Sequence, residues 1–326
     1  MTRHMLLVPL SIAFLTTACQ QAPDTAEEFR RGVPRQETVA VDGPGEGAGQ
    51  SQALTVESHS QALRGDVAGS YVVTRAVTGA VNGGAVFVGV LVKAVLRHPA
   101  TSVSADTAVW GPFTGDLEPV TWKVTVTRTA PHTFHYQFDG QPRGNASAPF
   151  VTVLSGTHTA AVDDLGEALE GFGEGNFLLD WEARATLPLP GRERGKATYT
   201  YSRQPGAATS VNAQFRQVLD DNGRRVDVDY AYTHQPGGGG TMDFIDTAAA
   251  QHGMPAGSAS VRSRWMPTGA GRWDVRGTVG AAPFTSNECW STTFASTYLA
   301  RSWEPTAGYG NEATDCAFPT AEYSKL

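Results

Sequence analysis

Two pairs of ionisable side chains in this sequence are of residue types that can do chemistry. Asp180 and Glu182 are two residues apart, and a pair of carboxylates flanking a sugar bond is the catalytic arrangement of most glycoside hydrolases. His132 and His135 are the closest histidines in the body of the chain, but a metal site needs a third ligand. Histidines three apart on a strand also point to opposite faces. Carboxylate pairs are common on strands, so neither pair alone predicts a site.

Acidic residues also gather in two loops. The run at 220–223 (DDNG) lacks the alternating ligands and the closing Glu of a calcium loop. The run between residues 163 and 174 either gathers calcium at an exposed edge or is a solvated loop, the more common case. Its acidic residues are Asp163, Asp164, Glu167, Glu170 and Glu174. The chain has no GxSxG, SxxK, HExxH, P-loop or CxxC motif, so we expect no catalytic residues, no metal and no cofactor.

Cys19 directly follows a predicted export signal, residues 1–18. Arg3 begins a short basic region, and residues 5–15 form an apolar stretch of 11 residues. A bilayer span needs about 20 apolar residues, whereas this length fits a secretory signal. Residues 15–19 (LTTAC) resemble the lipobox of bacterial lipoproteins, with Thr16 where Leu is usual. The resemblance implies removal of residues 1–18 and stable anchoring through several acyl chains on Cys19.

Gln20 follows the cysteine. In Gram-negative lipoproteins, Asp at this position resembles a signal for retention in the inner membrane, and it is absent here. We therefore expect an outer-membrane lipoprotein, facing either the periplasm or the cell surface. Cys289 and Cys316 remain after Cys19 takes lipid, and an even pair in an oxidising compartment predicts a disulfide. Such a loop would stabilise the fold by roughly 3–4 kcal/mol. A metal site is the weaker alternative, because neither cysteine is near a His.

Composition divides the chain into two parts after the signal. Residues 19–61 are rich in Gly, Pro, Glu, Gln and Ser, which predicts a flexible tether. Residues 62–326 contain no second linker and are expected to form a single β-rich globular domain. The net charge is −7, with 32 acidic and 25 basic residues and no basic run, which argues against nucleic acid binding.

Apolar and polar residues alternate with period two from residue 120 onward, as in half-buried strands. About ten runs with short turns predict an α+β, β-dominated fold, an antiparallel meander that forms a strongly curved sheet or an open barrel. The predicted runs are 121–129, 133–138, 150–159, 176–185, 196–203, 211–219, 225–233, 241–247, 259–266 and 272–280.

One hairpin is predicted residue by residue from the Asn222-Gly223 pair, the strongest short signal for a type I′ turn. A turn centred there would place Phe215 opposite Tyr230 and Arg216 opposite Asp229. Apolar residues would then share one face and opposite charges the other, which a one-residue slip would destroy.

A second hairpin is predicted to turn through residues 267–271. It would place Trp265 opposite Trp273 and Arg264 opposite Asp274. The tryptophan pair is either part of the core or an aromatic surface that binds carbohydrate or lipid.

Two helices complete the prediction. Apolar residues recur at helical spacing over residues 66–97, and Pro99 ends the run, so we expect a long N-terminal helix against the concave face of the sheet. Its many β-branched residues and glycines are poor helix formers, and strands remain the alternative. Residues 289–303 (CWSTTFASTYLARSW) predict a short C-terminal helix with its aromatic residues on one side.

Several segments resemble a family of uncharacterised Gram-negative bacterial lipoproteins. They are WGPF at 110–113, VTWKVTVTR at 120–128, SRWMPTGAGRWDV at 263–275 and ECWSTTF at 288–294, with a later Cys. The resemblance covers residues 65–318 and implies a lipoprotein with one domain. No activity is attached to that family.

Two functions are compatible with this pattern. The first is a membrane-anchored, non-enzymatic envelope lipoprotein that binds an apolar ligand or an envelope protein partner. The second is an envelope hydrolase with carboxylates carried on loops. An aromatic pocket would favour the first function, and convergent carboxylates in a pocket would favour the second.

Overall fold

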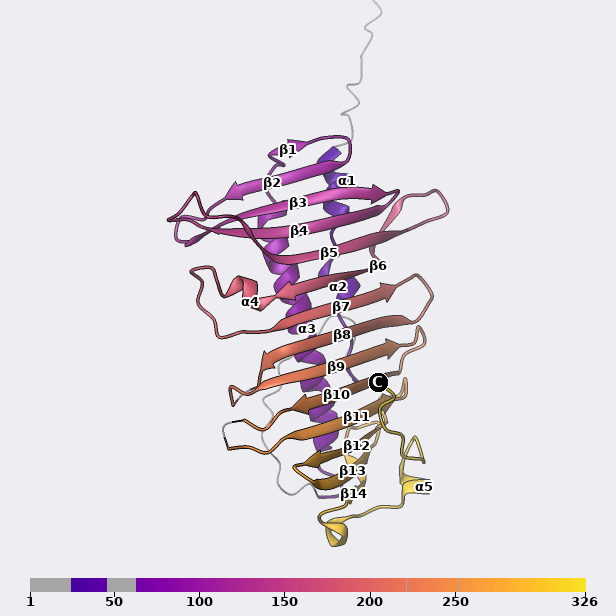
Figure 1. Ribbon diagram of the computed structural model, residues 1–326. Coiled ribbons are helices and arrows are strands. Elements are labelled where there is room, and N and C mark those ends of the chain that lie inside the picture. Colours follow the sequence, from indigo (N-terminus) through magenta and orange to yellow (C-terminus); the bar gives the residue numbers. More distant parts are fainter. Residues whose placement is uncertain (1–24, 46–62, 221, 252) are drawn as a thin grey trace, which may run out of the picture.

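One antiparallel sheet of 14 strands dominates the computed structural model, which describes residues 25–45, 63–220, 222–251 and 253–326. Each strand pairs with the strands before and after it in the sequence (Figure 1). The strands are β1 Ser102–Val103, β2 Thr107–Phe113, β3 Val120–Ala130, β4 Thr133–Pro142, β5 Val151–Val162, β6 Ala168–Asp180, β7 Lys196–Arg203, β8 Thr209–Leu219, β9 Arg225–His234, β10 Gly240–Ala248, β11 Gly257–Trp265, β12 Gly271–Val279, β13 Ala282–Trp290 and β14 Ser296–Arg301.

The predicted antiparallel meander is confirmed, but it has more strands than the ten expected. The ten predicted runs correspond to β3–β12, and β1, β2, β13 and β14 extend the sheet at its two edges. The edge strands β1 and β14 do not pair with each other, so the sheet is open rather than a closed barrel.

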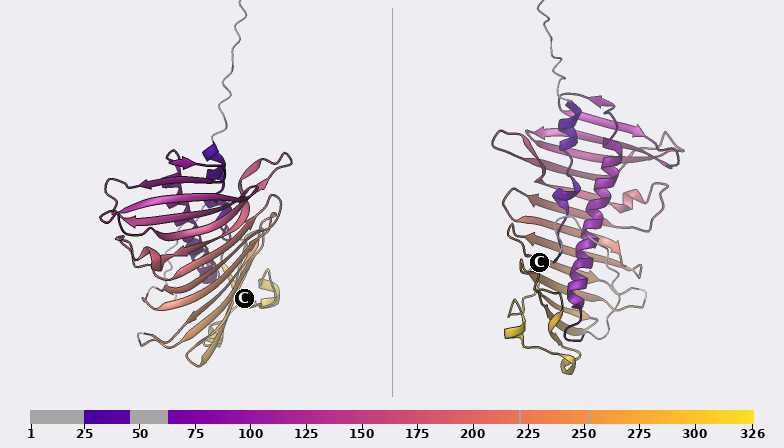
Figure 2. Two further views of the ribbon diagram at one scale, coloured as in Figure 1. Left: turned by 45° about the horizontal axis from the view of Figure 1, so that its top comes forward. Right: turned by 180° about the vertical axis from the view of Figure 1, so that it is seen from behind.

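The helix α3, Gly69–Leu96, crosses the strands on one face of the sheet (Figure 2). It lies within residues 66–97, where the apolar spacing predicts a helix. Its 28 residues give a length of about 42 Å, equal to about nine spacings of roughly 4.8 Å between strands. A helix of this length contacts strands as far apart as β12 and β2.

Side chains from the sheet bind the N-terminal end of α3. The Ser70 N–H donates to Glu288 Oε2 over 2.8 Å, and the Ser296 hydroxyl donates to Oε1 of the same carboxylate over 2.6 Å. A carboxylate is favoured there because the first N–H groups of a helix lack partners and carry partial positive charge.

The N-terminal arm, residues 25–45, packs on the same face as α3 (Figure 2). It contains the short helices α1, Thr25–Arg31, and α2, Gln36–Val39. Phe29 and Val41 are each 1% exposed. The Asn82 side chain of α3 bonds to both the N–H and the carbonyl of Val41, each over 2.8 Å.

This packing corrects the prediction of a flexible tether over residues 19–61. For residues 25–45 the prediction is wrong, because a few spaced apolar side chains are buried when the sheet and α3 supply the rest of the contact surface. Cys19, with residues 19–24, and residues 46–61 lie outside the described residues.

The β8–β9 hairpin has a different register from the predicted one. Ala213, and not Phe215, lies opposite Tyr230. Gly223, with a φ of +73°, donates its N–H to the Asp220 carbonyl, so the loop is longer than a two-residue type I′ turn. The longer loop and an extra residue in β8 together shift the register.

The β11–β12 hairpin is also shifted by two residues from the prediction. Trp265 lies opposite Gly271, and Trp273 lies opposite Ser263. The loop contains three residues, 267–269, instead of five, because hydrogen bonds join the residues on either side of it. A shift of two keeps every side chain on its face, and Trp265, 5% exposed, belongs to the core. It therefore does not form an exposed aromatic binding surface.

The predicted C-terminal helix over residues 289–303 is wrong. β13 ends at Trp290, a turn follows in which Phe294 has a φ of +64°, and β14 begins at Ser296. Trp290, Phe294 and Tyr298 are spaced by four residues, as on a helix. They lie instead at the end of β13, in the turn and in β14. Threonines in the segment favour extended backbone.

A buried ion cluster lies on the sheet face opposite α3. Arg272 and Asp274 are 0% exposed and Arg264 is 6% exposed. Asp274 accepts hydrogen bonds from Arg272 over 2.7 Å and from Arg264 over 3.1 Å. The carbonyls of Phe318 and Thr320 accept further bonds from these two arginines, so the C-terminal segment covers the cluster.

The disulfide predicted between Cys289 and Cys316 is confirmed, with a Cα–Cα distance of 5.4 Å. It joins β13 to the C-terminal segment, just after α5, Glu312–Asp315. The remaining elements are α4, Trp181–Arg184, and the 3-10 helix η1, Pro305–Ala307.

Candidate functional site

A groove lies between α4 and the turn that joins β8 to β9. Both lie at the same edge of the sheet, where β6 and β8 end (Figure 1). Its volume is about 440 Å³, within the roughly 300–1,000 Å³ of small-molecule sites. The lining contains four apolar and four charged side chains. They are Trp181, Phe215, Val218 and Leu219, and Arg192, Glu193, Arg194 and Asp220.

Asp180 and Glu182, the predicted carboxylate pair, hold the loop beside this groove. Asp180 accepts a backbone N–H of α4 over 2.8 Å and binds Lys196 Nζ at 2.7 Å. Glu182 accepts hydrogen bonds from Arg225 over 2.8 Å and from the Gly195 N–H over 2.9 Å, which lower its pKa. The bond to Asp180 raises the pKa of Lys196. Each carboxylate therefore neutralises a cation and stabilises the loop.

A β-bulge sets the apolar side of the groove. The register of β8 shifts between Phe215 and Val218, and Gln217 has a φ of +56°. Because β8 has one residue more than β9 here, Phe215 and Val218 fall on the same face, where a regular strand would turn one of them away. Arg216 still forms the predicted ion pair with Asp229, although the two are not directly opposite.

The acidic side chains of the lining have cationic partners outside it. Glu193 pairs with Arg184 at 3.3 Å, and Asp220 pairs with Arg224 at 3.1 Å. The Asp220 carboxylate also accepts two backbone N–H groups of its turn, over 2.8 Å and 2.9 Å. Neither acid is therefore available to neutralise the basic side chains of the groove.

Arg192 and Arg194 are the basic side chains of the lining. Arg192 is exposed, and Arg194 donates to the Glu193 carbonyl over 2.7 Å. Arg225 is the main cause of the lowered pKa of Glu182, and Arg194 adds to it. Within the described ranges neither Arg192 nor Arg194 forms an ion pair. The groove thus places uncompensated positive charge beside apolar side chains.

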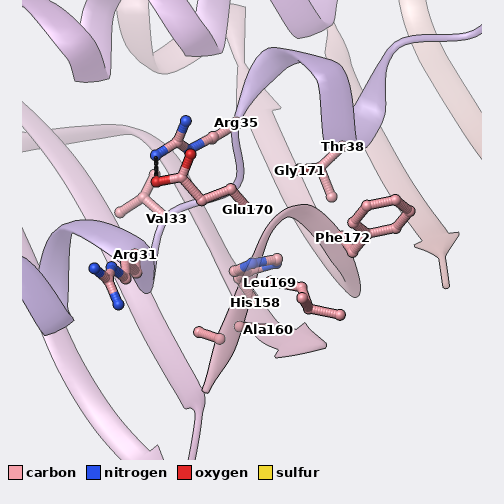
Figure 3. A pocket seen from close by; sticks show the side chains of 11 residues that line it. Arg31, Val33, Arg35, Thr38, His158, Ala160, Leu169, Glu170, Gly171 and Phe172 are labelled. Atoms are coloured by element: carbon pink, nitrogen blue, oxygen red, sulfur yellow. Dashed lines mark hydrogen bonds and ion pairs between the residues drawn. The ribbon is translucent and has the colours of Figure 1, made fainter. Parts of the chain in front are cut away.

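A second pocket lies between the N-terminal arm and strands β5 and β6 (Figure 3). Arg35 and Glu170, joined by an ion pair of 2.6 Å, line it together with His158. Its volume is about 20 Å³, which is room for about one water molecule. A pocket of this size does not accommodate an organic ligand.

His158 belongs to a buried chain of polar groups beside this pocket. It is 3% exposed, and its Nδ1 lies 2.9 Å from the Tyr201 hydroxyl. The buried Tyr136 hydroxyl donates to the Asn176 carbonyl over 3.4 Å. Burial lowers the pKa of His158 to about 4 and raises the pKa of both tyrosines. All three side chains are therefore uncharged at neutral pH.

His132 and His135 do not meet at a metal site. His132 lines an open cleft of about 380 Å³ that also contains Glu28 and Arg128, which pair with each other at 2.6 Å. His135 lies in β4. In the part of the chain that the structure describes, no three His, Cys, Asp or Glu side chains are grouped as metal ligands.

The acidic run between residues 163 and 174 begins in the turn between β5 and β6 and continues into β6. Asp163 accepts the N–H groups of Leu165 and Glu167, each over 2.9 Å, which is the usual role of Asp in a turn. Glu170 is the partner of Arg35. These contacts explain the positions of Asp163 and Glu170, and neither contact involves a metal ion.

Sequence reasoning did not identify the groove. Trp181 was expected within a strand over 176–185, and Phe215 was expected opposite Tyr230. The sequence does contain one relevant signal, the basic segment GRERGK at 191–196, which follows the apolar stretch LPLP at 187–190. Its position beside the β8–β9 turn follows from the antiparallel order, because β6 and β8 run in the same direction.

No protein-family model, curated protein or solved structure matches this chain. Among the helices of the described residues, none combines the length and hydropathy needed to cross a membrane. The groove and its charges are therefore the basis on which a function is inferred.

Proposed function

We propose that this protein is an outer-membrane lipoprotein, anchored through acylated Cys19, that binds an apolar ligand in the groove between α4 and the β8–β9 turn. The groove carries the proposal, because its volume suits a small molecule and Trp181 and Phe215 line it. Large aromatic side chains supply much of the binding energy in such sites. The lipobox-like sequence before Cys19 supports the anchor.

The anchor would hold one edge of the sheet close to the membrane. Cys19 is six residues before Thr25, the first residue of α1. Six residues span at most about 22 Å when extended. Because α1 packs against β2 and β3, these strands would lie near the bilayer, with the domain in the periplasm or at the cell surface.

Binding is favoured over hydrolysis by the contacts of the carboxylate pair. Asp180 is bonded to Lys196 and Glu182 to Arg225, and both pairs stabilise the loop that closes one side of the groove. A glycoside hydrolase would need one carboxyl group held in its protonated form, and the pKa of Glu182 is shifted downward instead.

The anchor is tested by labelling. Cells grown with a clickable fatty acid should yield a labelled wild-type protein and an unlabelled Cys19→Ala variant. Equal labelling of the two would show that the acyl group is not on Cys19.

The ligand is tested by native mass spectrometry. The chain from residue 20, exported behind an ordinary secretory signal and purified from its host without detergent, should carry an adduct with the mass of an apolar small molecule. Trp181→Ala/Phe215→Ala should lose it, whereas Leu117→Ala/Leu165→Ala should keep it, since these leucines are 99% and 86% exposed outside the groove. A bare chain, or a co-purifying protein without an adduct, would contradict the proposal.

A further inference from the structure

We infer that the ligand of the groove is an amphiphile with an anionic head group, a carboxylate or a phosphate, bound by Arg192 and Arg194. The inference rests on the proposed binding of an apolar ligand in the same groove. It adds the chemical class of the head group, which the apolar lining alone does not specify.

The charge balance of the lining supports an anion. Glu193 and Asp220 are neutralised by Arg184 and Arg224, which do not line the groove. The positive charge of the two lining arginines therefore remains for a ligand.

The chemistry of the guanidinium group supports the same choice. Its planar array of N–H donors matches the two oxygens of a carboxylate or phosphate. Arg192 has no hydrogen bond or ion pair in the described part of the chain, so its donors are available. Arg194 uses Nη1 for a backbone carbonyl and retains its other donors.

The apolar residues complete the match to an amphiphile. Trp181, Phe215 and Val218 line the groove together with the two arginines. A ligand with an apolar tail would remove water from around the head group, and an ion pair is stronger where water is excluded. A neutral apolar ligand would leave the arginines without a partner, and a small inorganic anion would leave the apolar surface wet.

The inference is tested by isothermal titration of the chain from residue 20, stripped of ligand, with dodecanoate, dodecyl phosphate and dodecan-1-ol. We expect at least one of the two anions to bind at least tenfold more tightly than the alcohol. The tighter of the two identifies the head group. The double variant Arg192→Gln/Arg194→Gln should weaken binding of the anion about tenfold or more and leave the alcohol nearly unchanged. The control Arg97→Gln, an exposed arginine outside the groove, should bind as the wild type does.

The possible outcomes separate the two proposals. If none of the three probes binds the wild type, the proposed function itself fails. If all three bind with similar affinity and the double variant binds them unchanged, apolar binding stands and the anionic head group is wrong. A tenfold loss of affinity for the anion in high salt would agree with the inference, because salt screens the exposed guanidinium groups.

Discussion

His158 is a histidine that the fold keeps neutral. Its place in β5 follows from alternation, since it has the same parity as the buried Leu154 and the polar residues between them face the other side. Its partner could not be predicted, because Tyr201 is 43 residues away in β7. Alternation gives the face of a side chain, whereas the group that it meets depends on the sheet order.

His158 predicts a loss of stability in acid. Its pKa is about 4 in the folded chain and about 6.5 in an unfolded one. As the pH falls below about 6.5, His158 becomes protonated in the unfolded chain, whereas in the folded chain it stays neutral until about pH 4. The free energy of unfolding should therefore fall by about 3 kcal/mol over this window through this residue.

The measurement is urea denaturation at pH 7, 5.5 and 4. His158→Gln should lack this part of the pH dependence. The difference in free energy of unfolding between the wild type and this variant should therefore shrink as the pH falls. His135→Gln should follow the wild type. Parallel curves for the wild type and His158→Gln would show that His158 is protonated equally in both states.

Arg272 predicts a large loss of stability when its charge is removed. Arg272→Met would leave the buried carboxylate of Asp274 with one arginine fewer, and removing one partner of a buried ion pair costs about 3–5 kcal/mol. Arg276→Met, on the same strand, is the control, because Arg276 is exposed and stacks on Tyr323. It should cost less than about 1 kcal/mol. Equal losses in chemical denaturation would mean that the C-terminal segment does not bury the cluster.

At the scale of elements, strand positions follow from the sequence more closely than strand pairing. Ten of the strands, β3–β12, follow from period-two alternation. Both hairpin registers were wrong, because the loops are closed by Gly223 and Gly269 at positive φ and Gln217 adds a bulge. Backbone conformation at single residues sets the register, and alternation is unchanged by a shift of two.

The side chains stay on the predicted faces of the strands despite the shift in register. Arg264 and Asp274, predicted to be opposite each other, form an ion pair across the diagonal. The C-terminal helix failed for a different reason. An apolar spacing of four arises on a helix and also on the two arms of a turn, and only the pairing of β13 with β14 decides between them.

The disulfide belongs to this scale, because it holds the C-terminal segment on β13. It closes a loop of 27 residues, and losing it should cost roughly 3–4 kcal/mol on the chain-entropy model. Cys289→Ser/Cys316→Ser should show this loss in chemical denaturation, and hydrogen exchange should rise over residues 312–324. The wild-type protein under reducing conditions should match the double variant. A stable double variant with unchanged exchange would show that the ion cluster alone holds the segment.

At the scale of the whole molecule, the sheet separates two surfaces. The N-terminal arm and α3 cover one face, and the C-terminal segment covers part of the other over β11–β13. The groove lies at the strand ends and takes its lining from α4, the loop before β7 and the β8–β9 turn. It depends on two segments that are about 30 residues apart, so no local motif in the sequence marks it.

The most direct test of a ligand in the groove is photo-crosslinking in living cells. A photoreactive, clickable fatty acid would be supplied to cells that produce the full-length protein, and crosslinked peptides would be mapped by mass spectrometry. Crosslinks are predicted in residues 181–195 and 215–223, and Trp181→Ala/Phe215→Ala should reduce these crosslinks. Cys19 should carry an acyl label in both proteins. Crosslinks spread over other segments, or label on Cys19 alone, would contradict a ligand site between α4 and the β8–β9 turn.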